Sequence, residues 1–291
     1  MSSPATACRV LDVGAARLAV VSPIASFHAQ LDEVYPYMDV IADEGFADVR
    51  VSLLPETRLL PGRRQARLWS EGDCPFEPYP LNAALPLFEW GSNWLLSQRL
   101  NAYLLLHAGV VARDGQALIL PATPGSGKTT LSCALHLAGW RFLSDEFGVV
   151  DIERREVLPM VRPAPLKNAS IEVMRARAGS RLGPLFPGTR KGDVAHFIPN
   201  QQSFQARQER ATPRLIVFPR FTAGAALSCI SLNPMQAALG LGQNSFNYQA
   251  LGTVGFETAI ALARTTRAYA LTYGDLDEAI AQIEHLFVST A

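Results

Sequence analysis

Short runs of apolar and β-branched residues, separated by turn-forming residues, characterise the first 80 positions of the chain. The segments 47–55 (ADVRVSLLP) and 64–72 (RQARLWSEG) are runs of this kind bounded by Pro or Gly, which favours strands. Residues 71–80 contain three prolines and predict an extended connector. We therefore expect residues 1–80 to form a β-rich N-terminal region.

The pattern changes after residue 80. Apolar residues fall near helical spacing over 81–106, which predicts a helix. Two apolar runs then flank ARDGQ, where Asp114-Gly115 is a strong signal for a hairpin turn. We therefore expect the strand that ends near residue 121 to be the second arm of an antiparallel hairpin.

Helices and strands are predicted to alternate over the rest of the chain. The spacing predicts a helix from Lys128 that ends at Gly139, and one or two strands over 141–151. Residues 160–220 are rich in Pro, Gly and Arg, with one short helix over 168–179. A strand over 213–221, helices over 233–266, a strand over 268–274 and a helix capped by Asp275 complete an α/β fold.

Composition narrows the class of protein. The chain has 291 residues, 48% of them hydrophobic, and its net charge is zero, so its overall charge indicates neither nucleic acid nor a membrane as partner. Four widely spaced cysteines, with no secretory leader pattern and no long apolar run, lead us to expect a cytoplasmic protein. Residues 160–220 nevertheless carry a local net charge of +8, which suggests a surface that handles anions.

The stretch PATPGSGKTT nearly matches the phosphate-binding loop pattern G-x-x-x-x-G-K-[ST], with Ala122 in place of the first glycine. Such a loop cradles phosphates with backbone N–H groups at a helix N-terminus. Lys128 is expected to reach the β- and γ-phosphates, and the Thr129 hydroxyl to bind Mg²⁺. The loop predicts ATP and Mg²⁺ as cofactors, and its nucleotide-binding candidates are Thr123, Pro124, Gly125, Ser126, Gly127, Lys128, Thr129 and Thr130.

Two acids follow the strand that comes after the loop's own helix. Asp145 lies 17 residues after Lys128, where a carboxylate would lie beside the γ-phosphate. An acid there can hold Mg²⁺ or accept a proton from an attacking hydroxyl, and Glu146 beside it allows the two tasks to be divided. The candidate metal ligands are Thr129, Asp145 and Glu146; a polar turn without catalytic function is the simpler alternative.

Four further residues are candidates for binding or stabilising phosphate. His107 precedes the loop's strand and could donate a hydrogen bond there, although a structural histidine is the simpler alternative. Arg162, Lys167 and Lys191 lie in segments flanked by Pro and Gly. Phosphoryl transfer usually requires cationic groups beyond the loop lysine. We expect Arg162 to bind the cofactor, and His107, Lys167 and Lys191 to assist catalysis.

In this order, the motif around His107, the hairpin, the loop and the acidic pair resemble the HPr kinase/phosphorylase superfamily. The segments PLKNASI, KGDVAHFIP, FNYQALG and DLDEAIA are similar to those of the branch called HPr kinase-related kinase A. The resemblance covers about residues 80–290 and implies a kinase domain over 81–291, with a P-loop core shared with phosphoenolpyruvate carboxykinase. It also implies that Asp145 is the general base and that Glu146 is its metal-binding or orienting partner. The chain departs from the family at Ala122, at Glu146 in place of a second aspartate, and at Gly109, which comes one residue late.

The resemblance implies an ATP-dependent kinase that phosphorylates a serine or other hydroxyl of a peptide or small protein. It suggests a PqqD-type peptide-binding protein as a partner and a homo-oligomer as the assembly. Two alternatives remain open at this point: a P-loop kinase that acts on a small molecule, and a nucleotide-binding protein without transfer activity. The residues do not identify the phosphate acceptor.

Overall fold

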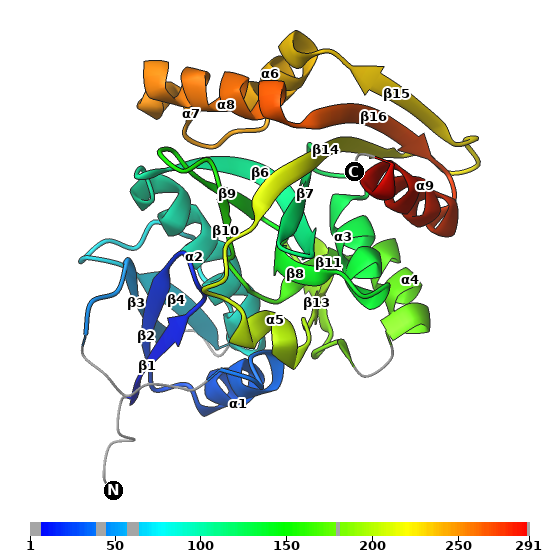
Figure 1. The fold of residues 1–291 in the computed structure, drawn as a ribbon. Helices are drawn as coiled ribbons and strands as arrows, with labels where there is room; N and C mark the ends of the chain where they lie inside the picture. Colours follow the sequence, from blue (N-terminus) through cyan, green and yellow to red (C-terminus); the bar gives the residue numbers. More distant parts are fainter. Residues whose placement is uncertain (1–6, 39–44, 57–63, 179–180, 290–291) are drawn as a thin grey trace, which may run out of the picture.

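The chain folds into a mixed α/β structure, described here by a computed structural model that covers residues 7–38, 45–56, 64–178 and 181–289 (Figure 1). A sheet from the first 80 positions lies beside a larger central sheet, and a third sheet is small (Figure 1). Within the described residues, no helix combines the length and apolar character that crossing a membrane requires.

The described residues of the first 80 positions form a five-stranded sheet, as the prediction of a β-rich region requires. Its strands run in chain order and pair antiparallel, except for the parallel pair β2–β3. A helix, α1 (Ala25–Val34), was not predicted; Phe27, Leu31 and Val34 recur at helical spacing and are buried, so the signal was present in a short segment. The strands are β1 (Ala7–Asp12), β2 (Arg17–Ser22), β3 (Val49–Glu56), β4 (Gln65–Trp69) and β5 (Tyr79–Pro80).

The helix predicted over 81–106 is shorter than expected. A 3₁₀ turn, η1 (Leu81–Ala83), leads into α2 (Ala84–Arg99), and β6 already begins at Tyr103, so the prediction is wrong after residue 99. The last apolar residues of that run belong to a buried strand, which helical and strand periodicity cannot separate over so few positions. α2 packs against β3, β4 and α1.

The central sheet has the order β10-β9-β6-β7-β14-β16-β15, with β8 also paired to β6. The predicted hairpin is confirmed: β6 and β7 pair antiparallel, and Asp114 and Gly115 both have positive φ. On its other side β7 pairs in parallel with β14, and β14 with β16. The strands are β6 (Tyr103–Arg113), β7 (Gln116–Pro121), β8 (Arg141–Ser144), β9 (Phe147–Asp151), β10 (Val157–Leu158), β14 (Thr212–Phe221), β15 (Ser228–Leu232) and β16 (Arg267–Tyr273).

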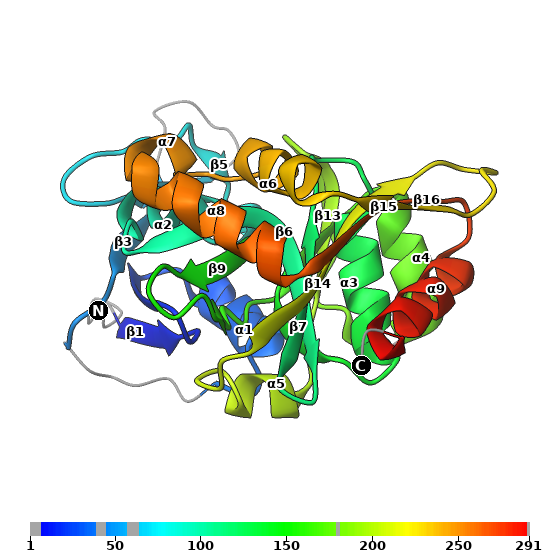
Figure 2. The same ribbon diagram turned by 45° about the horizontal axis from the view of Figure 1, so that its top comes forward.

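Helices cover the two faces of this sheet (Figures 1 and 2). One face carries α3 (Lys128–Leu137), α4 (Ala169–Ala178) and α9 (Leu276–Val288). The other carries α6 (Pro234–Gln243), α7 (Tyr248–Leu251) and α8 (Thr253–Thr265). Alternate residues of β14 divide between them, since Leu215 and Val217 join the core on the α3 face and Ile216 joins the core on the α8 face. The predicted cap at Asp275 is confirmed, because its side chain accepts from the N–H groups of two residues in the first turn of α9.

Residues 160–220 contain more regular structure than expected. Besides α4 and a short helix, α5 (Gln201–Gln205), they form a three-stranded antiparallel sheet in the order β11-β13-β12. The strands are short and contain Pro or Gly, which removes the periodicity that would have revealed them. They are β11 (Ala164–Lys167), β12 (Phe186–Thr189) and β13 (Gly192–Phe197).

Part of the charge of this basic segment is balanced by acids from elsewhere in the chain. Arginines of the segment pair with acids of the N-terminal sheet, α2, β9 and α9. These four arginines of the segment are therefore held by acids within the molecule, while Lys167 and Lys191 are not among them. The pairs are Arg162–Glu89, Arg177–Asp277, Arg207–Asp12 and Arg210–Asp151.

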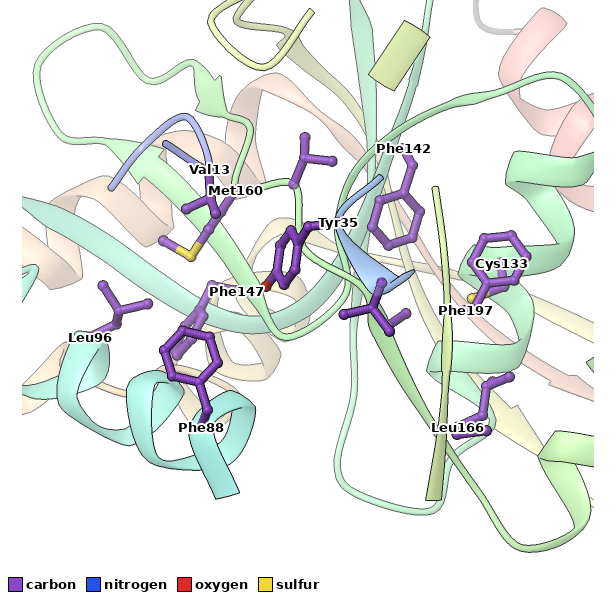
Figure 3. Packing of buried hydrophobic residues seen from close by; sticks show 14 of the residues in the cluster. Val13, Tyr35, Phe88, Leu96, Cys133, Phe142, Phe147, Met160, Leu166 and Phe197 are labelled. Atoms are coloured by element: carbon purple, nitrogen blue, oxygen red, sulfur yellow. The ribbon is translucent and has the colours of Figure 1, made fainter. Parts of the chain in front are cut away.

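One apolar core joins the N-terminal region to the rest of the molecule. Figure 3 shows Tyr35, which follows α1, together with Phe88 of α2 and Phe147 of β9 in the same packed region. All three are buried and belong to one cluster. The boundary predicted between residues 80 and 81 therefore lies within a continuous core.

A buried histidine predicts how stability depends on pH. His136 Nδ1 donates to the Trp140 carbonyl at 2.7 Å, so Nε2 is the acceptor for the Asn200 N–H at 3.1 Å and the Arg181 guanidinium at 3.2 Å. Burial lowers the His136 pKa to about 4. The hydrogen bond to Trp140 opposes this shift, and the Arg181 charge adds to it.

The folded state thus binds fewer protons than the unfolded chain below the ordinary histidine pKa. Stability should fall as the pH drops from about 6.5 towards 4. We expect the lowered pKa of His136 to decrease the free energy of unfolding by about 2 kcal/mol as the pH falls from 7 to 5. Urea denaturation should show a weaker pH dependence for His136→Gln than for wild type; equal dependence would contradict this account.

Candidate functional site

The phosphate-loop sequence forms a tight connection between a strand and a helix. β7 ends at Pro121 and α3 begins at Lys128. Gly125 and Gly127 both adopt the left-handed conformation, with φ of 87° and 85°. Ala122 is buried and does not have positive φ, so alanine is compatible with the backbone at the loop entrance.

The N-terminus of α3 is open to an anion. Gly127 is the N-cap, no side chain caps the helix, and its first turn contains no acid. The first N–H groups of a helix have no partner within it, and they favour negative charge. Ser126 Oγ is also buried within the loop and has no hydrogen-bond partner among the described residues. Both features suit a ligand with phosphate oxygens.

Close packing holds this helix terminus in place. A Cβ built at Gly127 would come within 2.6 Å of Tyr273 Oη and 2.8 Å of Phe221 Cβ. A Cβ at Gly109 on β6 would come within 2.0 Å of Ser132 Oγ on α3. Glycine at these two positions lets the neighbouring elements approach the loop and its helix.

Lys128, Thr129 and Asp145 meet at the start of α3. Lys128 Nζ donates to Asp145 Oδ1 at 3.1 Å and also to the Asp145 carbonyl, while Thr129 Oγ1 donates to Asp145 Oδ2 at 2.8 Å. The side chains of Lys128 and Asp145 are 6% and 3% exposed. Asp145 follows β8 directly, as predicted. A carboxylate is therefore fixed beside the phosphate loop by two residues of the loop's own helix.

The arrangement of oxygens fits Mg²⁺ held together with a nucleotide. Thr129 Oγ1 and Asp145 Oδ2 bring two hard oxygen ligands together. The described residues contain no group of three or more His, Cys, Asp or Glu that could hold a metal ion unaided. Mg²⁺ is usually bound through one or two protein oxygens, substrate phosphates and water, so this donor set suits it.

His107 and Glu146 lie next to this centre. His107 Nε2 is 3.9 Å from Glu146 Oε1. The backbone N–H of His107 donates to the Asn244 carbonyl at 2.6 Å. Burial and then the Lys128 charge lower the His107 pKa, which favours a neutral imidazole. Burial would raise the pKa of Glu146, but nearby cations, first among them Lys128, lower it and keep the carboxylate ionised. Glu146 is the more accessible acid, with 35% of its side chain exposed.

The structure brings Lys167 and Lys191 to the same place. Both lysines act electrostatically on Glu146, and partial burial followed by the charge of Lys167 lowers the Lys191 pKa. Lys167 ends β11, while Lys191 lies in the turn between β12 and β13. The Lys191 ammonium sits 5.0 Å from the ring centre of Trp90 on α2. Residues far apart in sequence thus surround the acidic pair with positive charge.

Arg162 requires a correction. We expected it to bind the cofactor, but its buried guanidinium pairs with Glu89 Oε2 at 2.8 Å and donates to Tyr35 Oη at 3.2 Å. It also donates to Ser92 Oγ at 2.9 Å and to Asn93 Oδ1. Each nitrogen of the guanidinium thus has a partner, and turning it to a phosphate would leave Glu89 buried without its cation.

Sequence reasoning missed the aromatic residues around the site. The Trp90 ring contacts the Lys191 ammonium, and the ring centre of Phe246 lies 5.5 Å from that of His107. Phe221 and Tyr273 pack against Gly127. No sequence pattern links these positions to the loop, because each contact is between distant segments.

A cavity lined by apolar side chains lies away from this centre. It has a volume of about 630 Å³ and lies between α6 and α8, where apolar side chains such as Met235, Leu239 and Phe256 line it. A small cavity of about 20 Å³ lies beside Asp145. A phosphate loop binds through exposed backbone N–H groups rather than an enclosed cavity, so the small cavity volume beside Asp145 is compatible with this candidate site.

The chain matches no protein-family model, and a search of curated proteins finds no significant match.

Proposed function

We propose that the protein is a P-loop kinase, of the HPr kinase and phosphoenolpyruvate carboxykinase type, that transfers the γ-phosphoryl group of ATP to a hydroxyl of a peptide or small protein. The observation that carries the proposal is the convergence of Lys128, Thr129 and Asp145 at the open N-terminus of α3. A nucleotide-binding loop with a carboxylate fixed beside it is what phosphoryl transfer requires.

The loop and its lysine bind the triphosphate. Backbone N–H groups of residues 125–130 surround the phosphates, and the Lys128 ammonium exchanges Asp145 Oδ1 for phosphate oxygens. Thr129 and Asp145, whose side-chain oxygens meet at 2.8 Å, would hold Mg²⁺, and Glu146, the next residue in the chain, would assist. The metal, when bound, neutralises charge on the phosphates. Lys167, Lys191 and a neutral His107 stabilise the charge that develops on the transferred group.

Asp145 then acts as the general base. Once Lys128 has turned to the phosphates, Asp145 Oδ1 has lost its cationic partner and can accept the proton of the acceptor hydroxyl. The hydroxyl oxygen forms a bond to the γ-phosphorus, and the bond to the oxygen that bridges the β- and γ-phosphates breaks, which releases ADP. Because Lys128 leaves Asp145 only for the phosphates of a bound nucleotide, Asp145 would be free to act as the base only when nucleotide is present.

The class of acceptor rests on the resemblance to the HPr kinase-related kinase A branch, which suggests a peptide or small protein and a PqqD-type partner. Lys167 and Lys191 lie at the protein surface, so we infer that the acceptor side of the site is open to solvent. An open approach suits a segment of a larger molecule.

Transfer from γ-labelled ATP tests the proposal. The protein is incubated with labelled ATP, Mg²⁺ and a panel of serine-containing peptides and small proteins, with and without a PqqD-type protein. We expect label on a serine or other hydroxyl of a peptide or protein. Label on a metabolite would favour a small-molecule kinase, and binding of ATP without transfer to any acceptor would favour a nucleotide-binding protein.

A further inference from the structure

The direction of a bound nucleotide follows from the order of the strands. Asp145, directly after β8, and His107, on β6, mark the γ-phosphate end and lie on one side of the loop's strand β7. On the other side lie β14 and β16, both parallel to β7. Ligands of parallel sheets lie across the carboxyl ends of the strands. With its γ-phosphate at Asp145, a nucleotide must therefore extend its nucleoside across the ends of β14 and β16.

An accessible aromatic residue stands at that place. Phe221 is the last residue of β14, and 46% of it is exposed. It lies two residues after Pro219 and four after Val217, so strand alternation puts it on the same face as Val217 and α3. The exposed ring thus lies on the loop's face of the sheet.

Phe221 is also fixed to the phosphate loop. Its N–H donates to the Ser126 carbonyl at 2.8 Å, and its Cβ lies against Gly127. Its ring packs edge-on against Tyr273, with 5.6 Å between ring centres, and Tyr273 is buried. An apolar ring that its neighbours fix in place, and that is accessible beside a phosphate site, can stack against a planar group of the ligand.

We infer that the Phe221 ring is the platform against which the purine base of the bound nucleotide stacks. This inference rests on the proposed function, since it requires that the loop binds a nucleoside triphosphate. Stacking tolerates either purine, so Phe221 supplies affinity for the base without selecting adenine over guanine.

Comparison of ATP with inorganic tripolyphosphate isolates the contribution of the base. Phe221→Ala keeps the Cβ and the backbone hydrogen bond to Ser126. We expect this variant to bind ATP about tenfold more weakly than wild type and to bind tripolyphosphate unchanged. Phe221→Tyr should restore ATP affinity. Phe256→Ala, at a similarly exposed phenylalanine on α8, is the matched control and should change neither affinity.

Isothermal titration of each variant with the two ligands gives the result. Equal weakening of both ligands would show that Phe221 only supports the loop, and unchanged ATP affinity would show that the base lies elsewhere; either outcome overturns the inference while nucleotide binding stands. If wild type binds neither ligand, the proposed function itself fails.

Discussion

Replacing Asp145 with Asn should lower the rate of phosphoryl transfer by about 10²- to 10⁴-fold while the protein still folds and binds ATP. Asn keeps the size of the side chain and one oxygen for Thr129 or Mg²⁺, but it cannot accept the proton of the acceptor. The assay with γ-labelled ATP measures the rate, and titration with ATP measures binding.

Two neighbouring acids provide the comparison. Glu146→Gln should cost less, because the hydrogen bonds from Thr129 Oγ1 and Lys128 Nζ go to Asp145, whereas Glu146 lies 3.9 Å from His107. Glu153→Gln, at an exposed position after β9, should leave the rate unchanged. A transfer rate that is unaffected by Asp145→Asn would remove Asp145 from the role of base, and a larger loss in Glu146→Gln would assign that role to Glu146.

Replacing Arg162 with Met should destabilise the protein by about 3–5 kcal/mol, because it leaves Glu89 buried without its cation. The side chains of both residues are only 7% exposed, so water cannot replace the lost partner easily. The midpoint of urea denaturation should fall accordingly, and the double variant Arg162→Met/Glu89→Met should recover part of the loss.

The same variant decides what Arg162 does. If its role is structural, ATP affinity in conditions where Arg162→Met remains folded should stay within about threefold of wild type, a difference below 1 kcal/mol. A stable variant that binds ATP much more weakly would instead place Arg162 on the phosphates, contrary to the contacts with Glu89 and Tyr35.

Features encoded by neighbouring residues were predictable from sequence. The hairpin turn at Asp114-Gly115, the cap at Asp275 and the position of Asp145 after a strand depend on residues a few positions apart, and the structure confirms them. Helix α1 and the three-stranded sheet were missed because their segments are short and carry weak or interrupted periodicity. Within the site, the placing of Lys128 beside Asp145 follows from a single β-loop-α-β unit.

Contacts between distant segments could not be predicted. Arg162 was assigned to phosphate on the basis of its charge, but its partner Glu89 lies 73 residues away on α2. Trp90 under Lys191 and Phe221 against Gly127 are likewise products of tertiary packing. A single sequence carries no local sign of which acid or ring will meet a given cation.

The position of α2 between the two larger sheets has a consequence for how this protein could diversify. The helix packs on β3 and β4 with one part of its surface, and with Glu89 and Trp90 it holds Arg162 and the lysine-bearing turn near the acids. A change in the N-terminal sheet that tilts α2 would therefore move Lys191 without touching the nucleotide loop. Changes in the first 80 residues can in this way shift a lysine beside the acidic pair while the loop and its helix stay unchanged.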